Sequence, residues 1–175
     1  MSDAAVYAFA KATLTPIANE AELQFVLAVF RLETGYSTGW PIGEGAGSNN
    51  WGADQEPDLS KPHFDHVDKH GDGKEYVAHF KVYPSPFHGM TGGAKTILKP
   101  NVRAALASGD GDGAVAAMRV NKYFEAPLDA YAAAVRRNHA ALVRGAGIAP
   151  AVSFGVLTNS TGLLLAAAAL LFFWK

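Results

Sequence analysis

The sequence predicts an α+β protein, in which a mostly helical body carries one small β-hairpin and an apolar helix follows at the C-terminal end. Apolar residues recur at helical spacing through most of the chain, whereas residues 64–82 are rich in aromatic and β-branched residues around a glycine-containing turn. The run 148–174 carries no charge. With 175 residues the chain can form one domain with a sizeable core.

The first two helices have clear boundaries. Residues 3–14 form the first, because Pro16 follows and proline cannot continue a helix. The second spans residues 19–33, with Asn19 as its N-cap and Gly35 in the position that commonly ends a helix. Its apolar residues recur at helical spacing and predict one buried stripe: Leu23, Val26, Leu27 and Phe30.

The middle of the chain changes character. Residues 38–62 are rich in Gly, Pro, Ser and Asn and are expected to be mainly loop. The hairpin over 64–82 turns at residues 70–73. Helices are expected again after Pro86, over residues 88–98, 100–107, 113–120 and 127–144.

Composition excludes several kinds of chemistry. The chain has no Cys, so disulfides, thiolate zinc sites and cysteine nucleophiles are ruled out. The formal net charge of -1 gives no reason to expect a nucleic-acid partner. No cofactor is expected.

The C-terminal segment predicts a membrane anchor. A bilayer core needs about 20 helical residues, and residues 152–174 meet that length, with Trp174 and Lys175 as an interfacial anchor. A buried C-terminal helix is the alternative. We therefore expect a body over residues 1–147 and an anchor over 148–175, with a lipid bilayer as partner.

Glu33 is the most informative side chain. It follows Phe30 by three residues and so continues the apolar stripe of its helix. A carboxyl group among apolar neighbours has a raised pKa and stays protonated near neutral pH, as a general acid for glycoside cleavage requires. The alternative is a helix-terminal Glu that forms a salt bridge with Arg31.

Four short blocks occur in order along the chain: Glu-Thr-Gly-Tyr-Ser at 33–37, Ser-Asn-Asn-Trp-Gly-Ala at 48–53, Phe-Lys-Val-Tyr-Pro-Ser at 80–85, and Lys-Tyr-Phe-Glu-Ala-Pro at 122–127 followed by Tyr131. Together they resemble the glucosaminidase branch of the lysozyme superfamily, the family of flagellar muramidases and bacterial autolysins. The resemblance covers residues 23–143 and implies a lysozyme-like fold and a peptidoglycan substrate.

The resemblance also implies roles for single residues. Glu33 matches the catalytic acid and Tyr123 the tyrosine that faces the reacting sugar. Asn49 and Asn50 match the residues that shape the floor of the groove, where amides can hydrogen-bond sugar groups. Three aromatic residues are further candidates for substrate contact, although a tryptophan can equally belong to the core: Tyr36, Trp40 and Trp51.

The second carboxylate of the family has no direct match in this sequence. The family places a Glu on the first arm of the hairpin, and the matching position is near Val67. Asp65 projects from the same strand face as Val67 and is favoured, whereas Asp68 points to the other face. Assistance by the substrate's own acetamido group would make this carboxylate unnecessary. Three loop carboxylates remain open as alternatives: Glu44, Asp54 and Glu56.

Potential metal ligands gather in the hairpin: His63, Asp65, His66, Asp68, His70 and Asp72. Of these, His66, Asp68 and His70 share a strand face. The segment from Asp68 resembles a calcium loop, but its third position is His70 and its twelfth is His79. A solvated polar hairpin without a metal is the expectation.

The expected function is therefore hydrolysis of β-1,4 bonds in the glycan strands of peptidoglycan, with the bond specificity of an N-acetylglucosaminidase or of a muramidase. A lytic transglycosylase is one alternative, and an inactive membrane-anchored wall-binding or virion protein is another. A peptidase on the same scaffold is disfavoured by the missing Cys and zinc motif.

The first residues lack the pattern of an export signal. With the apolar tail, this favours a bacteriophage protein that acts in wall penetration or lysis, in contact with virion or envelope proteins, over a bacterial cell-envelope enzyme.

Overall fold

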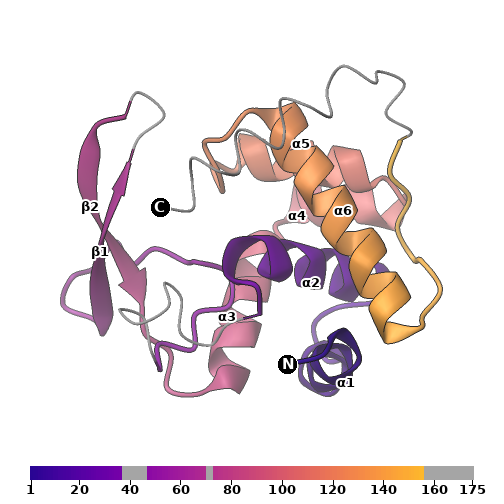
Figure 1. Cartoon of the computed structure of the whole chain (residues 1–175), viewed down its shortest axis with the longest axis horizontal. Helices are drawn as coiled ribbons and strands as arrows, with labels where there is room; N and C mark the ends of the chain where they lie inside the picture. Colours follow the sequence, from indigo (N-terminus) through magenta and orange to yellow (C-terminus); the bar gives the residue numbers. More distant parts are fainter. Residues whose placement is uncertain (37–46, 70–72, 156–175) are drawn as a thin grey trace.

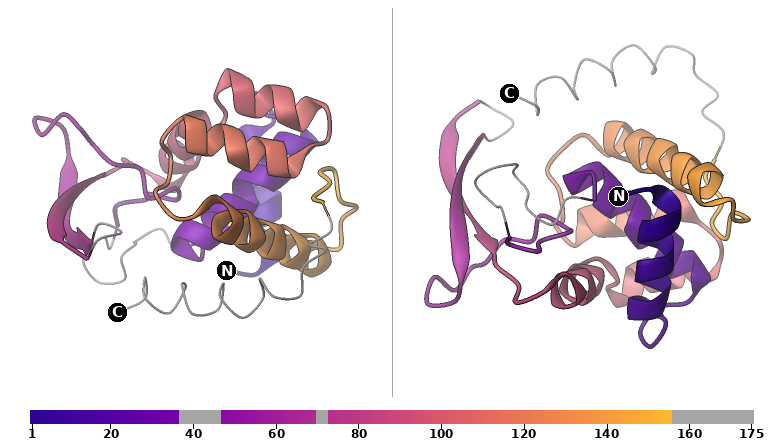
Figure 2. Two further views of the ribbon diagram at one scale, coloured as in Figure 1. Left: turned by 90° about the horizontal axis from the view of Figure 1, so that it is seen from above. Right: turned by 60° about the horizontal axis from the view of Figure 1, so that its bottom comes forward.

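The computed structural model describes residues 1–36, 47–69 and 73–155. Within these ranges the chain forms six helices and a two-stranded antiparallel sheet: α1 (Asp3–Leu14), α2 (Glu20–Thr34), β1 (His63–Lys69), β2 (Glu75–Lys81), α3 (Pro86–Ile97), α4 (Pro100–Ala107), α5 (Gly111–Val120) and α6 (Leu128–Ala146). The hairpin stands at one end of the molecule, beside the helices (Figure 1, Figure 2). The predicted α+β arrangement is confirmed.

Helix α2 begins and ends as the sequence predicts. The Asn19 side chain accepts a hydrogen bond from the Glu22 backbone N–H, and the Glu22 carboxylate accepts one from the Asn19 N–H, which completes a capping box. Gly35 ends the helix in the left-handed region at φ 60°.

The burial of α2 is wider than the single predicted stripe. Every residue from 22 to 30 is buried, because α1, α4 and α6 all pack against this helix. The polar residues among them are paired. The Glu22 carboxylate accepts a hydrogen bond from Arg103 of α4 at 2.7 Å, which offsets the cost of burying its charge.

The stretch 148–155, which the sequence groups with the tail, packs on the body. The Gln24 side chain of α2 donates to the Ala149 carbonyl oxygen and accepts from the Ala151 N–H, each at 2.9 Å. The Ser153 N–H donates to the carbonyl oxygen of Gly109, just before α5, and the Gly111 N–H at the start of α5 donates to the Ser153 carbonyl oxygen. The packed body therefore extends past Gly147.

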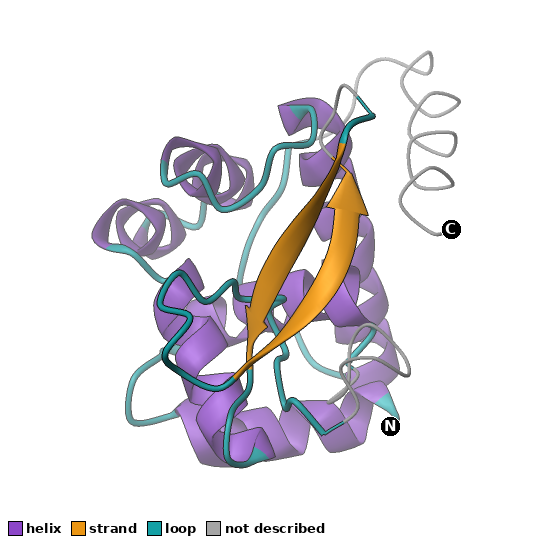
Figure 3. Cartoon of the chain, turned by 90° about the vertical axis from the view of Figure 1, so that its left-hand side faces the viewer, coloured by secondary structure: helices purple, strands orange, loops and turns teal. Residues whose placement is uncertain are grey.

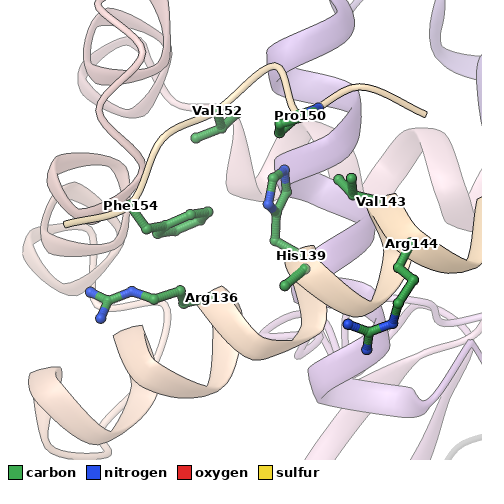
Figure 4. Close-up of a pocket in the computed structure, with 8 residues that line it drawn as sticks. Arg136, His139, Val143, Arg144, Pro150, Val152 and Phe154 are labelled. Atoms are coloured by element: carbon green, nitrogen blue, oxygen red, sulfur yellow. The ribbon is translucent and has the colours of Figure 1, made fainter. Parts of the chain in front are cut away.

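A shallow pocket of about 340 Å³ lies between α6 and this stretch. His139 projects from α6 toward Pro150 and Val152, with Phe154 beside it (Figure 4). Among residues 1–36, 47–69 and 73–155, no helix is both long enough and apolar enough to cross a membrane. Residues 156–175 lie outside the described chain, so the predicted anchor stays a prediction.

The hairpin has an inner and an outer face. Phe64 and Phe80 pair across the strands, with ring centroids 5.5 Å apart, and Phe80 is buried on the inner face. Asp65 pairs with His79 on the outer face, which is mainly exposed. Figure 3 shows the two strands lying in front of the helical body.

The loop before the hairpin anchors it. Residues 54–56 run along the free edge of β2: the Lys81 N–H donates to the Asp54 carbonyl oxygen, and the Glu56 N–H donates to that of His79. The fully buried Asn50 side chain donates to the carbonyl oxygens of both Asp54 and Lys81. Asp54 is thereby held against β2.

Helix α3 approaches the same loop closely at Gly89. A Cβ atom added at Gly89 would lie 1.7 Å from the Asn49 carbonyl oxygen, a distance that no packing adjustment of side chains can relieve. We therefore expect Gly89→Ala to lower the free energy of unfolding by about 3 kcal/mol or more, at or above the upper end of ordinary overpacking. Chemical denaturation followed by circular dichroism measures this change.

The matched control is Lys95→Ala, which truncates an exposed side chain of the same helix. We expect it to change stability by less than about 0.5 kcal/mol. Equal stability of the Gly89→Ala variant and the wild type would contradict the close approach of α3 to Asn49.

Candidate active site

Glu33 lies in the last turn of α2, half-buried at the end of the most buried helix. The Tyr131 hydroxyl of α6 donates a hydrogen bond to its Oε1. Burial raises the pKa of Glu33 to about 7; the Tyr131 hydrogen bond opposes this rise, and the negative charge of Asp54 adds to it. Near neutral pH this carboxyl group can therefore both hold and release a proton.

Tyr131 is held firmly in place. Only 7% of it is exposed, and its ring stacks on Phe124 with centroids 3.7 Å apart and planes 2° from parallel. Burial and then the charge of Glu33 raise the pKa of Tyr131 well above its usual value, so the phenol keeps its proton and acts as a donor. The sequence placed Tyr131 in a family block without giving it a role.

Asp54 is the second carboxyl group that the fold brings to this place. It is 4% exposed, and its Oδ2 accepts a hydrogen bond from the Tyr83 hydroxyl at 2.7 Å. Burial raises the pKa of Asp54, against the effects of the Tyr83 hydrogen bond and the Lys81 charge. Glu44 falls outside the described residues, and of the other two loop carboxylates left open by the sequence it is Asp54 whose charge raises the pKa of Glu33.

Tyr123 completes the group. Its hydroxyl donates to the Gly52 carbonyl oxygen at 2.7 Å, and burial, Glu33 and Asp54 raise the pKa of Tyr123 well above its usual value. A Cβ atom added at Gly52 would lie 3.2 Å from the Tyr123 hydroxyl and 3.5 Å from Asp54 Oδ1, so both side chains face the same point. We call this group the carboxylate–tyrosine cluster: Glu33, Asp54, Tyr83, Tyr123 and Tyr131.

The two predicted asparagines support the cluster through backbone contacts. Asn50 is fully buried, and its Oδ1 accepts from the Asp54 N–H at 2.8 Å while its Nδ2 donates to carbonyl oxygens. Its amide is therefore used within the protein and positions Asp54. Asn49 adopts φ 55°, and its Nδ2 donates to the Tyr83 carbonyl oxygen at 2.9 Å. Its side chain is partly exposed.

Two of the three aromatic residues predicted to contact the substrate are buried in the structure. Trp51 is fully buried between Phe9 and Phe30, and its Nε1–H donates to the Pro86 carbonyl oxygen at 3.1 Å. The structure corrects the expected sugar contact, because no face of the indole is exposed. Tyr36 is 7% exposed beneath the Arg31 guanidinium. Trp40 lies outside the described residues.

Asp65 takes a different place from the one expected of a catalytic carboxylate. Its Oδ1 lies 2.7 Å from His79 Nδ1 on the exposed face of the hairpin, and its side chain is 61% exposed. Asp68 lies on the inner face, where the Tyr76 hydroxyl donates to it at 3.2 Å. A catalytic role for Asp65 stays a prediction, which this outward orientation disfavours.

The remaining candidates are spread apart. Glu56 is buried and accepts a hydrogen bond from the Asp58 N–H, while Glu44 falls outside the described residues. His66 and Asp68 share the inner face of the hairpin, and His70 and Asp72 fall outside the described residues. Within the described part of the chain, the potential metal ligands that the fold brings together are His63, Asp65 and His79.

The structure is similar to that of a C-terminally truncated glycoside hydrolase domain of FlgJ from Salmonella typhimurium, with a TM-score of 0.48 and 18% sequence identity over 79% of this chain and 98% of that chain. No family model and no curated protein matches the sequence. The assignment of a function therefore depends on the residues of this chain.

Two substitutions should move the pKa of Glu33 in opposite directions. Asp54→Asn removes a nearby negative charge and is expected to lower it, whereas Tyr131→Phe removes a hydrogen bond to the carboxylate and is expected to raise it. Carboxyl chemical shifts followed by NMR through a pH titration measure both. Shifts of the same sign in both variants would contradict the geometry of the cluster.

The raised pKa of Glu33 also predicts a pH-dependent stability. Folded Glu33 binds its proton more tightly than unfolded Glu33, so between about pH 4.5 and 7 the folded state holds more protons, and raising the pH lowers the free energy of unfolding. At about 1.4 kcal/mol per pKa unit, this loss is on the order of 1–3 kcal/mol after allowance for partial exposure.

Glu33→Gln removes this loss. Its stability relative to the wild type should therefore increase as the pH rises through that window, as measured by urea denaturation at several pH values. A stability difference that stays constant from pH 4 to pH 8 would show that Glu33 titrates normally.

Proposed function

We propose that this protein hydrolyses β-1,4 glycosidic bonds in the glycan strands of peptidoglycan, with Glu33 as the general acid. The observation that carries the proposal is the environment of Glu33, a half-buried carboxyl group with a pKa of about 7 next to a second buried carboxyl group. A glycosidase needs a carboxylic acid that is still protonated at working pH in order to protonate the leaving oxygen.

The cluster supplies the other parts of such a mechanism. Glu33 donates its proton to the glycosidic oxygen, and a water molecule or the substrate's acetamido oxygen attacks the anomeric carbon. The negative charge of Asp54 raises the pKa of Glu33, and a carboxylate at this place would stabilise the positive charge that develops on the sugar ring. The Tyr123 hydroxyl oxygen, whose proton is donated to Gly52, presents its lone pairs to the same charge.

The substrate class comes from the sequence blocks that contain these residues. Glu33, Tyr83, Tyr123 and Tyr131 each belong to one of the four blocks that resemble glucosaminidases of the lysozyme superfamily, and Asp54 follows the second block directly. N-acetylglucosaminidase specificity is the proposal that fits this resemblance, and the products of the reaction distinguish it from the related specificities.

The test is digestion of purified peptidoglycan by the full chain and by its Glu33→Gln variant, with products identified by mass spectrometry. Gln keeps the shape of Glu and cannot donate the proton, so we expect turnover to fall by about 10²–10⁴-fold. Glu20→Gln is the matched control, because Glu20 lies at the opposite end of α2.

The ends of the fragments assign the reaction. Reducing GlcNAc ends support the proposed specificity, reducing MurNAc ends identify a muramidase, and anhydro-MurNAc ends identify a lytic transglycosylase. If folded wild-type protein binds peptidoglycan and releases no fragments, the enzymatic proposal is wrong and a wall-binding role replaces it.

A further inference from the structure

Three side chains on the outer face of the hairpin converge on one point. Asp65 of β1 lies opposite His79 of β2 in the strand register, and His63 precedes Asp65 by two residues and so projects from the same face. Asp65 Oδ1 lies 2.7 Å from His79 Nδ1 and 3.6 Å from His63 Nε2. All three ligand atoms lie within 4.8 Å of one another.

We propose that His63, Asp65 and His79 form a binding site for a divalent transition metal ion of the zinc type. In a tetrahedral zinc site with bonds of about 2.0–2.1 Å, neighbouring ligand atoms are about 3.3 Å apart. The two separations from Asp65 Oδ1, 2.7 and 3.6 Å, lie on either side of this value, and the two imidazole nitrogens lie within 4.8 Å of each other, so side-chain rotations can bring the three ligand atoms around one ion. This site is separate from the carboxylate–tyrosine cluster and does not depend on the proposed function.

The hydrogen bonding of His63 already suits a metal ligand. Its Nδ1 lies 2.8 Å from the Lys61 carbonyl oxygen, which can only accept, so Nδ1 carries the proton of the neutral ring. Nε2 then presents its lone pair toward Asp65 and His79. Metal-bound histidines are commonly oriented by such a hydrogen bond from the second ring nitrogen to a backbone carbonyl.

The ligand set selects the kind of ion. Two imidazole nitrogens and one carboxylate oxygen suit Zn²⁺, Co²⁺, Ni²⁺ or Cu²⁺, whereas Ca²⁺ and Mg²⁺ require oxygen ligands. The side chains of His63, Asp65 and His79 are 24%, 61% and 32% exposed, so an ion can enter from solvent and keep a water ligand. On binding, His79 must move its proton from Nδ1 to Nε2.

Metal binding would cross-link the two strands of the hairpin. Residues 63 and 65 belong to β1 and residue 79 to β2, so one ion would join both strands near the end where residues 54–56 pair with β2. We therefore expect the metal to raise the melting temperature of the protein as well as to bind.

The test is titration of the full, untagged chain with Co²⁺ and with Zn²⁺. Visible absorption of bound Co²⁺ and calorimetry with Zn²⁺ report binding, and circular dichroism reports folding and melting. We expect saturable binding that weakens as the solution is made acidic, because protons compete with the metal for the imidazole nitrogens. Metal binding should weaken by at least about tenfold in each of three variants: Asp65→Asn, His63→Gln and His79→Gln.

The matched control is His66→Gln, on the opposite face of β1, which should bind the metal as the wild type does. The proposal is wrong if the wild type shows no saturable binding, if folded Asp65→Asn and His79→Gln variants bind as tightly as the wild type, or if His66→Gln loses binding to the same extent as His63→Gln.

Discussion

Helix α2 passes through the middle of the body with residues 22–30 buried, and the positions of its neighbours follow from the need to cover it. Glu33 follows this buried run in the last turn, and burial there removes water from its carboxyl group. The packing of α6 against α2 also brings Tyr131 to Glu33. The hydrophobic effect that stabilises the body therefore also creates the environment that raises the pKa of Glu33.

The loop from Asn49 to Glu56 connects this body to the hairpin, and it acts mainly through its backbone. Both ends of the Asn50 side-chain amide form hydrogen bonds with the backbone of Asp54 or Lys81. The Trp51 ring packs between Phe9 and Phe30. These contacts hold the Asp54 carboxyl group next to Glu33. Burial raises the pKa of both carboxyl groups, and the charge of Asp54 raises that of Glu33 further.

Alternate side chains of the hairpin lie on opposite faces of the sheet, so its two faces carry different residues. Its inner face carries Phe80 and Asp68 toward the body, and its outer face carries His63, Asp65 and His79 into solvent. A shift of one residue in the strand register would exchange the two faces. The burial of Phe80 and the pairing of residues 54–56 with β2 oppose such a shift.

Local signals in the sequence determined the helices, the capping of α2, the hairpin and the place of Glu33 at the end of α2, because caps, glycines and apolar spacing act over a few residues. They could not distinguish a groove asparagine from a buried one at Asn50, nor a sugar-binding tryptophan from a core one at Trp51. The partners of Glu33 are 21 residues away at Asp54 and 98 away at Tyr131, and only the packing of the loop and α6 against α2 brings them together. The same holds for His79, 14 residues beyond Asp65, whose meeting depends on strand register. Long-range contacts of this kind are decided by how the elements share one core, which no local pattern encodes.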